Sequence, residues 1–220
     1  FFFKQKTAYE ISTRDWSSDV CSSDLELIRQ RVRALKDHPA LLAWYLADEP
    51  EYHRVLPESV EQLRALISEE DPWHPTIVLN NTFGGIRQFA QGGDITAPDP
   101  YPFFKRGGLS SSMDRVGTFI AEAASCIRPG QTAWVVPQGH DTRDWGGNGE
   151  RAPTFAESRN MVWQAVSAGA RGVVWWDWNW VFPNTIDSVL GNAYLARELN
   201  ALKPYVLAPR SEEHTSELQS

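Results

Sequence analysis

The sequence predicts an α/β fold in which helices alternate with parallel strands, as part of a (β/α)8 barrel. Five apolar runs of strand length alternate with segments of helical periodicity. The runs are apolar throughout, which is typical of parallel strands covered by helices. An open doubly wound sheet shares this alternation. However, each run ends in polar or aromatic residues, and in a barrel such strand ends meet on the face that carries the active site.

The first half of the predicted unit contains three helices and two strands. A helix is expected over residues 26–37, with its apolar residues on one face, and the His38–Pro39 pair ends it. The apolar run 40–47 follows as a strand. The apolar spacing then predicts a helix over 59–70, a strand over 76–81 and a short helix over 84–90.

The second half continues the same pattern. A strand region is expected over 94–102, a helix over 110–126 after a serine cap, and a strand over 132–138. Thr154 and Glu157 have the spacing of a capping box before a helix that Gly169 ends. The strand 172–179 follows, and a helix over 193–205 is the last expected element.

Both ends of the chain are expected to lie outside the folded unit. The stretches "STRDWSSDVCSSDL" (12–25) and "RSEEHTSELQS" (210–220) have neither helical nor strand periodicity. Moreover, "KQKTAYEI", "DWSSDVCSSDL" and "RSEEHTSELQS" resemble translations of a short-read sequencing adapter. We therefore expect residues 1–25 and 210–220 to be adapter-derived, to form no domain and to pack little against the unit at 26–209.

Composition excludes several classes of partner for the unit at 26–209. It has 17 basic and 21 acidic side chains, a net charge of −4, which argues against nucleic acid or an anionic membrane. It has no apolar run long enough to cross a bilayer. Cys126 is its only cysteine, so it forms no internal disulfide. Its histidines lack metal-ligand spacing, and we expect neither metal nor cofactor. The oligomeric state is left open.

The candidate functional residues stand where the predicted strands end. Carboxylates, amides and aromatic rings in these positions are not what a buried core requires. They are Asp48 and Glu49, Asn80 and Asn81, Asp99 and Tyr101, Gln138 and His140, and Trp176 and Asp177. In a barrel they would converge on one cleft.

The stretch "HPALLAWYLADEPE" (38–51) resembles the fourth strand of (β/α)8-barrel glycoside hydrolases that place a Glu-Pro pair there. Farther along, "DITAPDPYP", "VVPQGH" and "RAPTFAESRNMVWQAVSAGARGVVWWDW" follow the order of strands six, seven and eight. The resemblance covers about residues 26–205. It implies that the unit is the C-terminal part of such a barrel, about strands four to eight, with the N-terminal strands missing.

This resemblance implies an enzyme that hydrolyses O-glycosidic bonds in an oligo- or polysaccharide, inactive as a partial barrel and located outside the cell or in the periplasm. Glu49 corresponds to the general acid and base. The family has Asn before it, whereas this chain has Asp48. Asp48 and Asp177 are the other expected catalytic residues. Substrate contacts are expected from Asp99, Tyr101, Gln138, His140, Trp176 and Asn80.

The seventh strand departs from the family pattern. Retaining members have a nucleophilic Glu there, and this chain has Gln138. An amide cannot act as the carboxylate nucleophile. Three alternatives follow: Asp48, Asp99 or Asp177 is the second carboxylate; a substrate group attacks instead; or the protein is a non-catalytic carbohydrate-binding barrel.

Structural explanations compete with these functional ones. Asp48, Glu49 and Pro50 could cap the helix that follows, since acids and proline favour a helix start. The Gly-rich loop 139–151 could be an active-site lid or a plain linker. The tryptophan cluster could stack on sugar rings or fill the core, and strand alternation predicts some of each for Trp175, Trp176, Trp178 and Trp180.

Overall fold

The computed structural model describes residues 2–3, 22–103, 112–141, 143, 151–176 and 186–208. Strands and helices alternate along the chain. They are β1 (Phe2–Phe3), α1 (Ser22–Leu35), β2 (Trp44–Ala47), a 3-10 helix (Pro50–Tyr52), α2 (Pro57–Glu70), β3 (Thr76–Asn80), α3 (Phe83–Phe89), β4 (Ile95–Pro98), α4 (Arg115–Cys126), β5 (Thr132–Val135), α5 (Phe155–Ala168), β6 (Gly172–Trp175) and α6 (Ile186–Val206).

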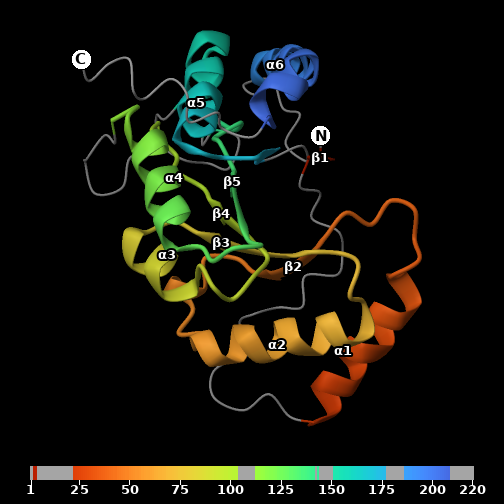
Figure 1. Ribbon diagram of the computed structural model, residues 1–220. Helices are drawn as coiled ribbons and strands as arrows, with labels where there is room; N and C mark the ends of the chain where they lie inside the picture. The colour runs from red at the N-terminus through yellow and green to blue at the C-terminus, as the bar shows by residue number, and fades with distance from the viewer. Residues whose placement is uncertain are drawn as a thin grey trace, which may run out of the picture.

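The strands form one parallel sheet in the order β1-β6-β5-β4-β3-β2. Strands β2 to β6 thus lie side by side in chain order, and Figure 1 shows them as a curled sheet with the helices around its outer side. Neighbouring helices pack on one another from α1 to α6, without α6 closing on α1. The structure confirms the predicted α/β fold, a partial (β/α)8 barrel. All five strands expected from the sequence are present, as β2 to β6.

Both faces of the strands are apolar, which explains the continuous apolar runs. Val78 faces α1 and α2 and belongs to a core cluster with Ile28, Leu63 and Phe89. The next residue, Leu79, faces the opposite, inner side. It packs there in a second cluster whose other buried members are Ile95, Ala97 and Val136. Successive side chains of a strand point to opposite faces, so a parallel strand covered on both sides must be apolar at every position.

Several helices and strands begin at other residues than predicted. Strand β2 begins only at Trp44, four residues after the predicted start, because Trp44 is where the ladder to β3 begins, opposite Thr76. Helix α2 begins at Pro57, whose fixed φ and missing N–H suit the first helical position. Helix α6 begins at Ile186, seven residues before the predicted start.

The start of the chain also differs from the expectation. Helix α1 begins at Ser22, inside the stretch assigned to the adapter-like end. Phe2 and Phe3 form β1 and pair with Val174 and Trp175 of β6, although no strand was predicted there. The free edge of a parallel strand offers unpaired N–H and C=O groups, and phenylalanine favours strands. That edge therefore suffices to hold a short apolar segment.

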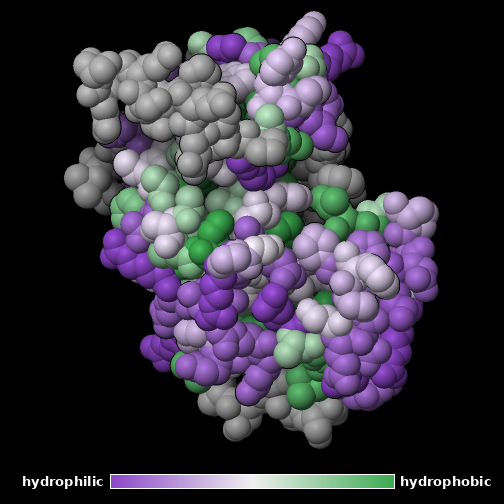
Figure 2. Space-filling view, viewed as in Figure 1, coloured by the Kyte–Doolittle hydropathy of each residue, from purple (hydrophilic) through white to green (hydrophobic). Residues whose placement is uncertain are grey.

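The surface has hydrophilic and hydrophobic regions. In Figure 2 hydrophilic residues cover the region of α1 and α2, whereas hydrophobic residues reach the surface in the middle of the view, where Figure 1 shows the strands. Several inner-face side chains, among them Ile77, Trp134 and Val174, are only partly buried. Within the described part of the chain, no helix combines the length and the apolar character needed to cross a membrane.

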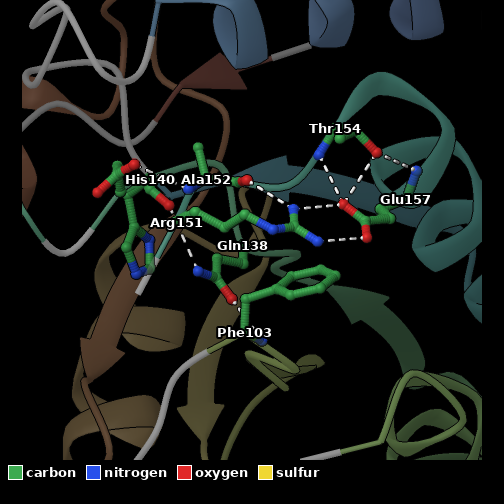
Figure 3. Close-up of polar contacts among 8 residues, drawn as sticks. Phe103, Gln138, His140, Arg151, Ala152, Thr154 and Glu157 are labelled. Atoms are coloured by element: carbon green, nitrogen blue, oxygen red, sulfur yellow. Dashed lines mark hydrogen bonds and ion pairs between the residues drawn. The ribbon is translucent and has the colours of Figure 1, made fainter. Parts of the chain in front are cut away.

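Helix α5 begins with the predicted capping box. The Thr154 hydroxyl accepts from the Glu157 backbone N–H, while the Glu157 carboxylate accepts from the Thr154 N–H at 2.8 Å. Arg151 adds two bonds to that carboxylate, both 2.7 Å long (Figure 3). These donors, Arg151 first, lower the pKa of Glu157 from 4.5 to about 2.

We predict that Glu157→Gln destabilises the protein at neutral pH, and that the difference from wild type shrinks as the pH falls from about 4.5 towards 2. The pKa of Glu157 is depressed in the folded state, so its stabilisation is present above the unfolded pKa and is lost as the carboxylate becomes protonated. Urea midpoints at pH 7 and pH 3 measure this. Glu61→Gln, on the exposed side of α2, is the control. An equal gap at both pH values would contradict the assignment.

Candidate active site

The predicted site residues stand just beyond the strands, and a chain of contacts joins them. The carboxyl groups of Glu49 and Asp99 lie near enough for each to act on the pKa of the other, so the loops after β2 and β4 come together here. Tyr101 contacts Asp99 and lies edge-on to the His140 ring, with centroids 4.9 Å apart. His140 Nδ1 lies 3.4 Å from the Trp176 carbonyl oxygen, beyond β6. Asp177, Trp178 and Trp180 lie outside the described residues.

Glu49 has an unusual backbone conformation. Its φ of 45° and ψ of 54° lie in the left-handed region, which costs a non-glycine residue about 1–2 kcal/mol. Pro50 follows it as the first residue of the 3-10 helix, and the Glu49 side chain makes no capping bond to that helix. The capping explanation therefore does not account for Glu49. Strained residues of this kind cluster at functional sites.

The environment of Glu49 favours its protonated form. The side chain is half-buried, and burial is the main cause that raises its pKa. The charges of Asp48 and Glu51 act in the same direction, while the interaction with Asp99 lowers the pKa. Asp48 itself accepts a 2.7 Å bond from the Tyr45 hydroxyl. A carboxyl group with a raised pKa is suited to donate a proton.

Asn80 and Asn81 have different surroundings. Asn80 is fully buried, and its Nδ2 donates to Glu51 at 2.9 Å. Asn81 Nδ2 donates to the Asp99 carbonyl at 3.0 Å and to Asp99 Oδ1 at 3.2 Å. Asn80 thus anchors the loop after β2, whereas Asn81 contacts Asp99.

Gln138 is fully buried, and its amide is engaged by the backbone. Its Oε1 accepts from the Phe103 N–H at 3.0 Å, and its Nε2 donates to the His140 carbonyl at 3.3 Å (Figure 3). The guanidinium of Arg151 lies over the Phe103 ring, 4.7 Å from the centroid. Gln138 therefore joins the loops after β4 and β5, and a substrate could reach its amide only by displacing one of these bonds.

The two adjacent tryptophans point in opposite directions. Trp175 is 1% exposed and packs with Val162, Leu195 and Leu199 under α5 and α6. Trp176 packs with the inner-face cluster and is partly exposed. Strand alternation thus assigns Trp175 to the core and leaves Trp176 on the side of the candidate site.

Glu51 is a positioning residue that the sequence did not reveal. Besides Asn80, its carboxylate accepts from the backbone N–H groups of Asn81 at 2.8 Å and Thr82 at 3.1 Å, and from the Thr82 hydroxyl at 3.3 Å. Asp141 has a similar role: fully buried, it accepts from Arg143 and from the Ala152 N–H. In sequence, each resembles an ordinary exposed acid in a loop.

Hollows elsewhere on the described surface are poorer candidates. One of about 620 Å³ lies between α4 and α5, and its lining residues, which include Gly117, Trp163 and Ser167, carry no titratable side chain. A second, of about 340 Å³, lies at the opposite end of β5 and β6, among apolar residues with Arg171 and Lys203. Neither contains a carboxyl group to do acid or base chemistry.

Comparison with family models gives no match, and comparison with curated proteins gives none. Among solved structures, the chain is similar to an exo-β-1,4-mannosidase from Opitutaceae bacterium strain TAV5, with TM-score 0.52, 15% identity, and 89% of this chain and 44% of that one covered. The chain is also similar to a β-D-glucuronidase of Dictyoglomus thermophilum, with TM-score 0.51 and 13% identity. That match covers 80% of this chain and 36% of the glucuronidase. The fold is glycoside hydrolase-like. The chain spans less than half the length of either protein.

We predict that Gly85→Ala destabilises the protein, whereas Gly84→Ala in the same helix does not. A Cβ at Gly85 would overlap the Glu51 carboxyl group, whose four hydrogen bonds hold it in place. At Gly84 the nearest atom, the Thr82 hydroxyl oxygen, would be 3.9 Å away. We expect Gly85→Ala to lower the free energy of unfolding by about 1–3 kcal/mol, and Gly84→Ala to leave it equal or slightly higher. Urea unfolding of both variants measures this, and equal effects would contradict the role of Glu51.

Proposed function

We propose that this chain is part of a glycoside hydrolase-like barrel that hydrolyses O-glycosidic bonds, with Glu49 as general acid and base. The observation that carries the proposal is Glu49 itself: a half-buried carboxyl group with a raised pKa, held in a left-handed conformation just beyond β2. Barrel enzymes have their chemistry at this end of the strands. Because one scaffold hosts many reactions, the fold alone would not support this proposal.

The proposed step is a proton transfer. Glu49 gives its proton to the glycosidic oxygen while the bond from that oxygen to the sugar carbon breaks, and the bonding electrons stay on the departing oxygen. The resulting carboxylate then takes a proton from the water that completes hydrolysis. Tyr101 packs against His140, and His140 lies next to the Trp176 carbonyl; these three residues are the proposed contacts for an oligo- or polysaccharide. No cofactor enters this step.

The second carboxylate is proposed to be Asp48 or Asp177. The two catalytic carboxyl groups stand about 5–5.5 Å apart in retaining glycosidases and about 6.5–9.5 Å apart in inverting ones, which leaves room for the sugar or a water. Burial raises the pKa of Asp99 well above its ordinary value, which makes Asp99 less suited to act as that charged group. Attack by a group of the substrate remains the alternative without a second carboxylate.

A carbohydrate-binding barrel without catalysis is the second candidate. Gln138 favours it, because the position where the resemblance expects a nucleophile holds an amide that bonds to the backbone of two loops. Such a protein would use the aromatic residues of the site and leave Glu49 without a chemical role.

We predict that Glu49→Gln, in the protein extended to its full barrel, lowers the hydrolysis of unactivated glycosides by about 10²–10⁴-fold. Glutamine keeps the shape of the side chain but has no acidic proton to donate. Aryl glycosides with good leaving groups need less protonation and should lose less activity. Initial rates on both substrate types measure the effect, with Glu58→Gln on the exposed side of α2 as the control.

Sugar binding to the same variants separates the two candidates. An enzyme should retain oligosaccharide binding in Glu49→Gln while its hydrolysis falls. If the wild-type protein binds oligosaccharide and hydrolyses none, and the substitution changes neither property, the binding barrel is the correct function.

A further inference from the structure

Asn81 stands directly after β3, between the ends of β2 and β4. Strand β3 pairs with β4 up to its last residue, so Asn81 and Asp99 follow the last pair of that ladder. Strands β2 and β3 are parallel neighbours as well, and Glu49 comes shortly after the end of β2. Adjacent strands lie about 4.7–4.9 Å apart. Asn81 is therefore one strand away from the proposed general acid and one strand away from Asp99.

The backbone of Asn81 is held on both sides. Its N–H donates to the Glu51 carboxylate at 2.8 Å, and its carbonyl oxygen accepts from Arg115 Nη2 at 3.3 Å. The Arg115 guanidinium itself lies over the Phe119 ring, 4.4 Å from the centroid. A side chain on a backbone fixed in this way is preorganised, so less conformational freedom is lost when it binds a ligand.

The hydrogen bonds of the Asn81 side chain determine which way its amide points. The Asp99 backbone carbonyl can only accept, so the amide atom 3.0 Å from it must be Nδ2. Nδ2 also donates to Asp99 Oδ1 at 3.2 Å, which uses its second hydrogen. Among the described residues, none donates a hydrogen bond to Asn81 Oδ1, and the side chain is partly exposed. This amide oxygen is therefore available to accept a hydrogen bond from a ligand.

The preceding residue, Asn80, is less suited to bind a ligand. Asn80 is 0% exposed, and its Nδ2 is bonded to the Glu51 carboxylate. A ligand could reach its amide only after the loop had opened. Of the two asparagines after β3, Asn81 is thus the one with an accessible acceptor.

We propose that Asn81 Oδ1 accepts a hydrogen bond from a hydroxyl group of the bound sugar. The inference rests on the proposed function, which places the sugar beside Glu49. Hydroxyl groups are the donors that a neutral sugar offers, and an amide oxygen accepts from them. The contact orients the sugar through one of its hydroxyl groups, while the proton transfer remains with Glu49.

Equilibrium binding of the methyl β-glycosides of glucose, galactose and mannose to the full barrel, measured by NMR titration, tests this. Each glycoside that binds is compared with its monodeoxy analogues, which lack one hydroxyl group each. We expect the loss of one particular hydroxyl to weaken binding to wild type by about twofold to tenfold, the range of one hydrogen bond. Asn81→Ala and Asn81→Ser remove the amide oxygen, so we expect the loss of that hydroxyl to have no effect there. Asn200→Ala, exposed on α6, is the control and should keep the wild-type penalty.

The pattern of penalties separates a contact with the sugar from a purely structural role. A variant that binds the deoxy analogue as tightly as wild type does is folded at the site. If every hydroxyl carries the same penalty in wild type and in both Asn81 variants, the proposal is overturned, even where glycosides are hydrolysed. Absence of binding by all three glycosides would overturn it as well. If the penalty disappears in the variants and wild type hydrolyses no glycoside, the hydrogen bond stands while the proposed hydrolysis fails.

Discussion

The carboxylate of Glu51 fixes the geometry on which the candidate site depends. Its four hydrogen bonds, from Asn80, Asn81 and Thr82, tie the 3-10 helix after β2 to the end of β3. Glu49 lies two residues before this anchor and Pro50 stands between them, so the left-handed backbone of Glu49 has little freedom to relax. Each bond to a charged acceptor contributes about 1.5–3 kcal/mol, enough to offset the strain of about 1–2 kcal/mol at Glu49. The glycine at position 85 belongs to the same arrangement, since it leaves room for that carboxylate.

Fixing Glu51 in this way places several acids in a small space, and the proton balance of the site follows. Asp48 and Glu49 follow β2, Asp99 follows β4, and the charges of Asp48 and Glu51 act on Glu49. Glu51 is surrounded by donors and Asp48 is bonded to Tyr45, so these two have partners for their charge. Glu49 and Asp99 are therefore the two carboxyl groups whose uncharged forms are favoured. The raised pKa of both residues expresses this constraint.

The sequence was sufficient for the fold because the signals were redundant. Apolar runs such as 76–81 indicated buried parallel strands, and their side chains do face both the helices and the inner side of the sheet. Parallel strands bring residues 48, 99 and 138 to the same end of the sheet. The sequence could not show which side chains there face one another. An acid such as Glu51, which is held by four hydrogen bonds, cannot be told in the sequence from an ordinary loop acid. The left-handed φ of Glu49 has no sequence signal either, because the residue is not a glycine. The strand β1 was not predicted because a segment of two residues is too short to show the alternation of a strand.

Gln138 and Asp99 are both buried, but one carries an amide and the other a carboxyl group. An amide at position 138 can both donate and accept, and it uses both abilities on the backbone of the loops after β4 and β5. A glutamate there would keep the acceptor but lose the donor to the His140 carbonyl, and it would add a buried charge. The same burial at Asp99 raises the pKa of its carboxyl group, which favours the uncharged form. The carboxyl groups of the candidate site thus stand after β2 and β4, whereas the position after β5 holds an amide.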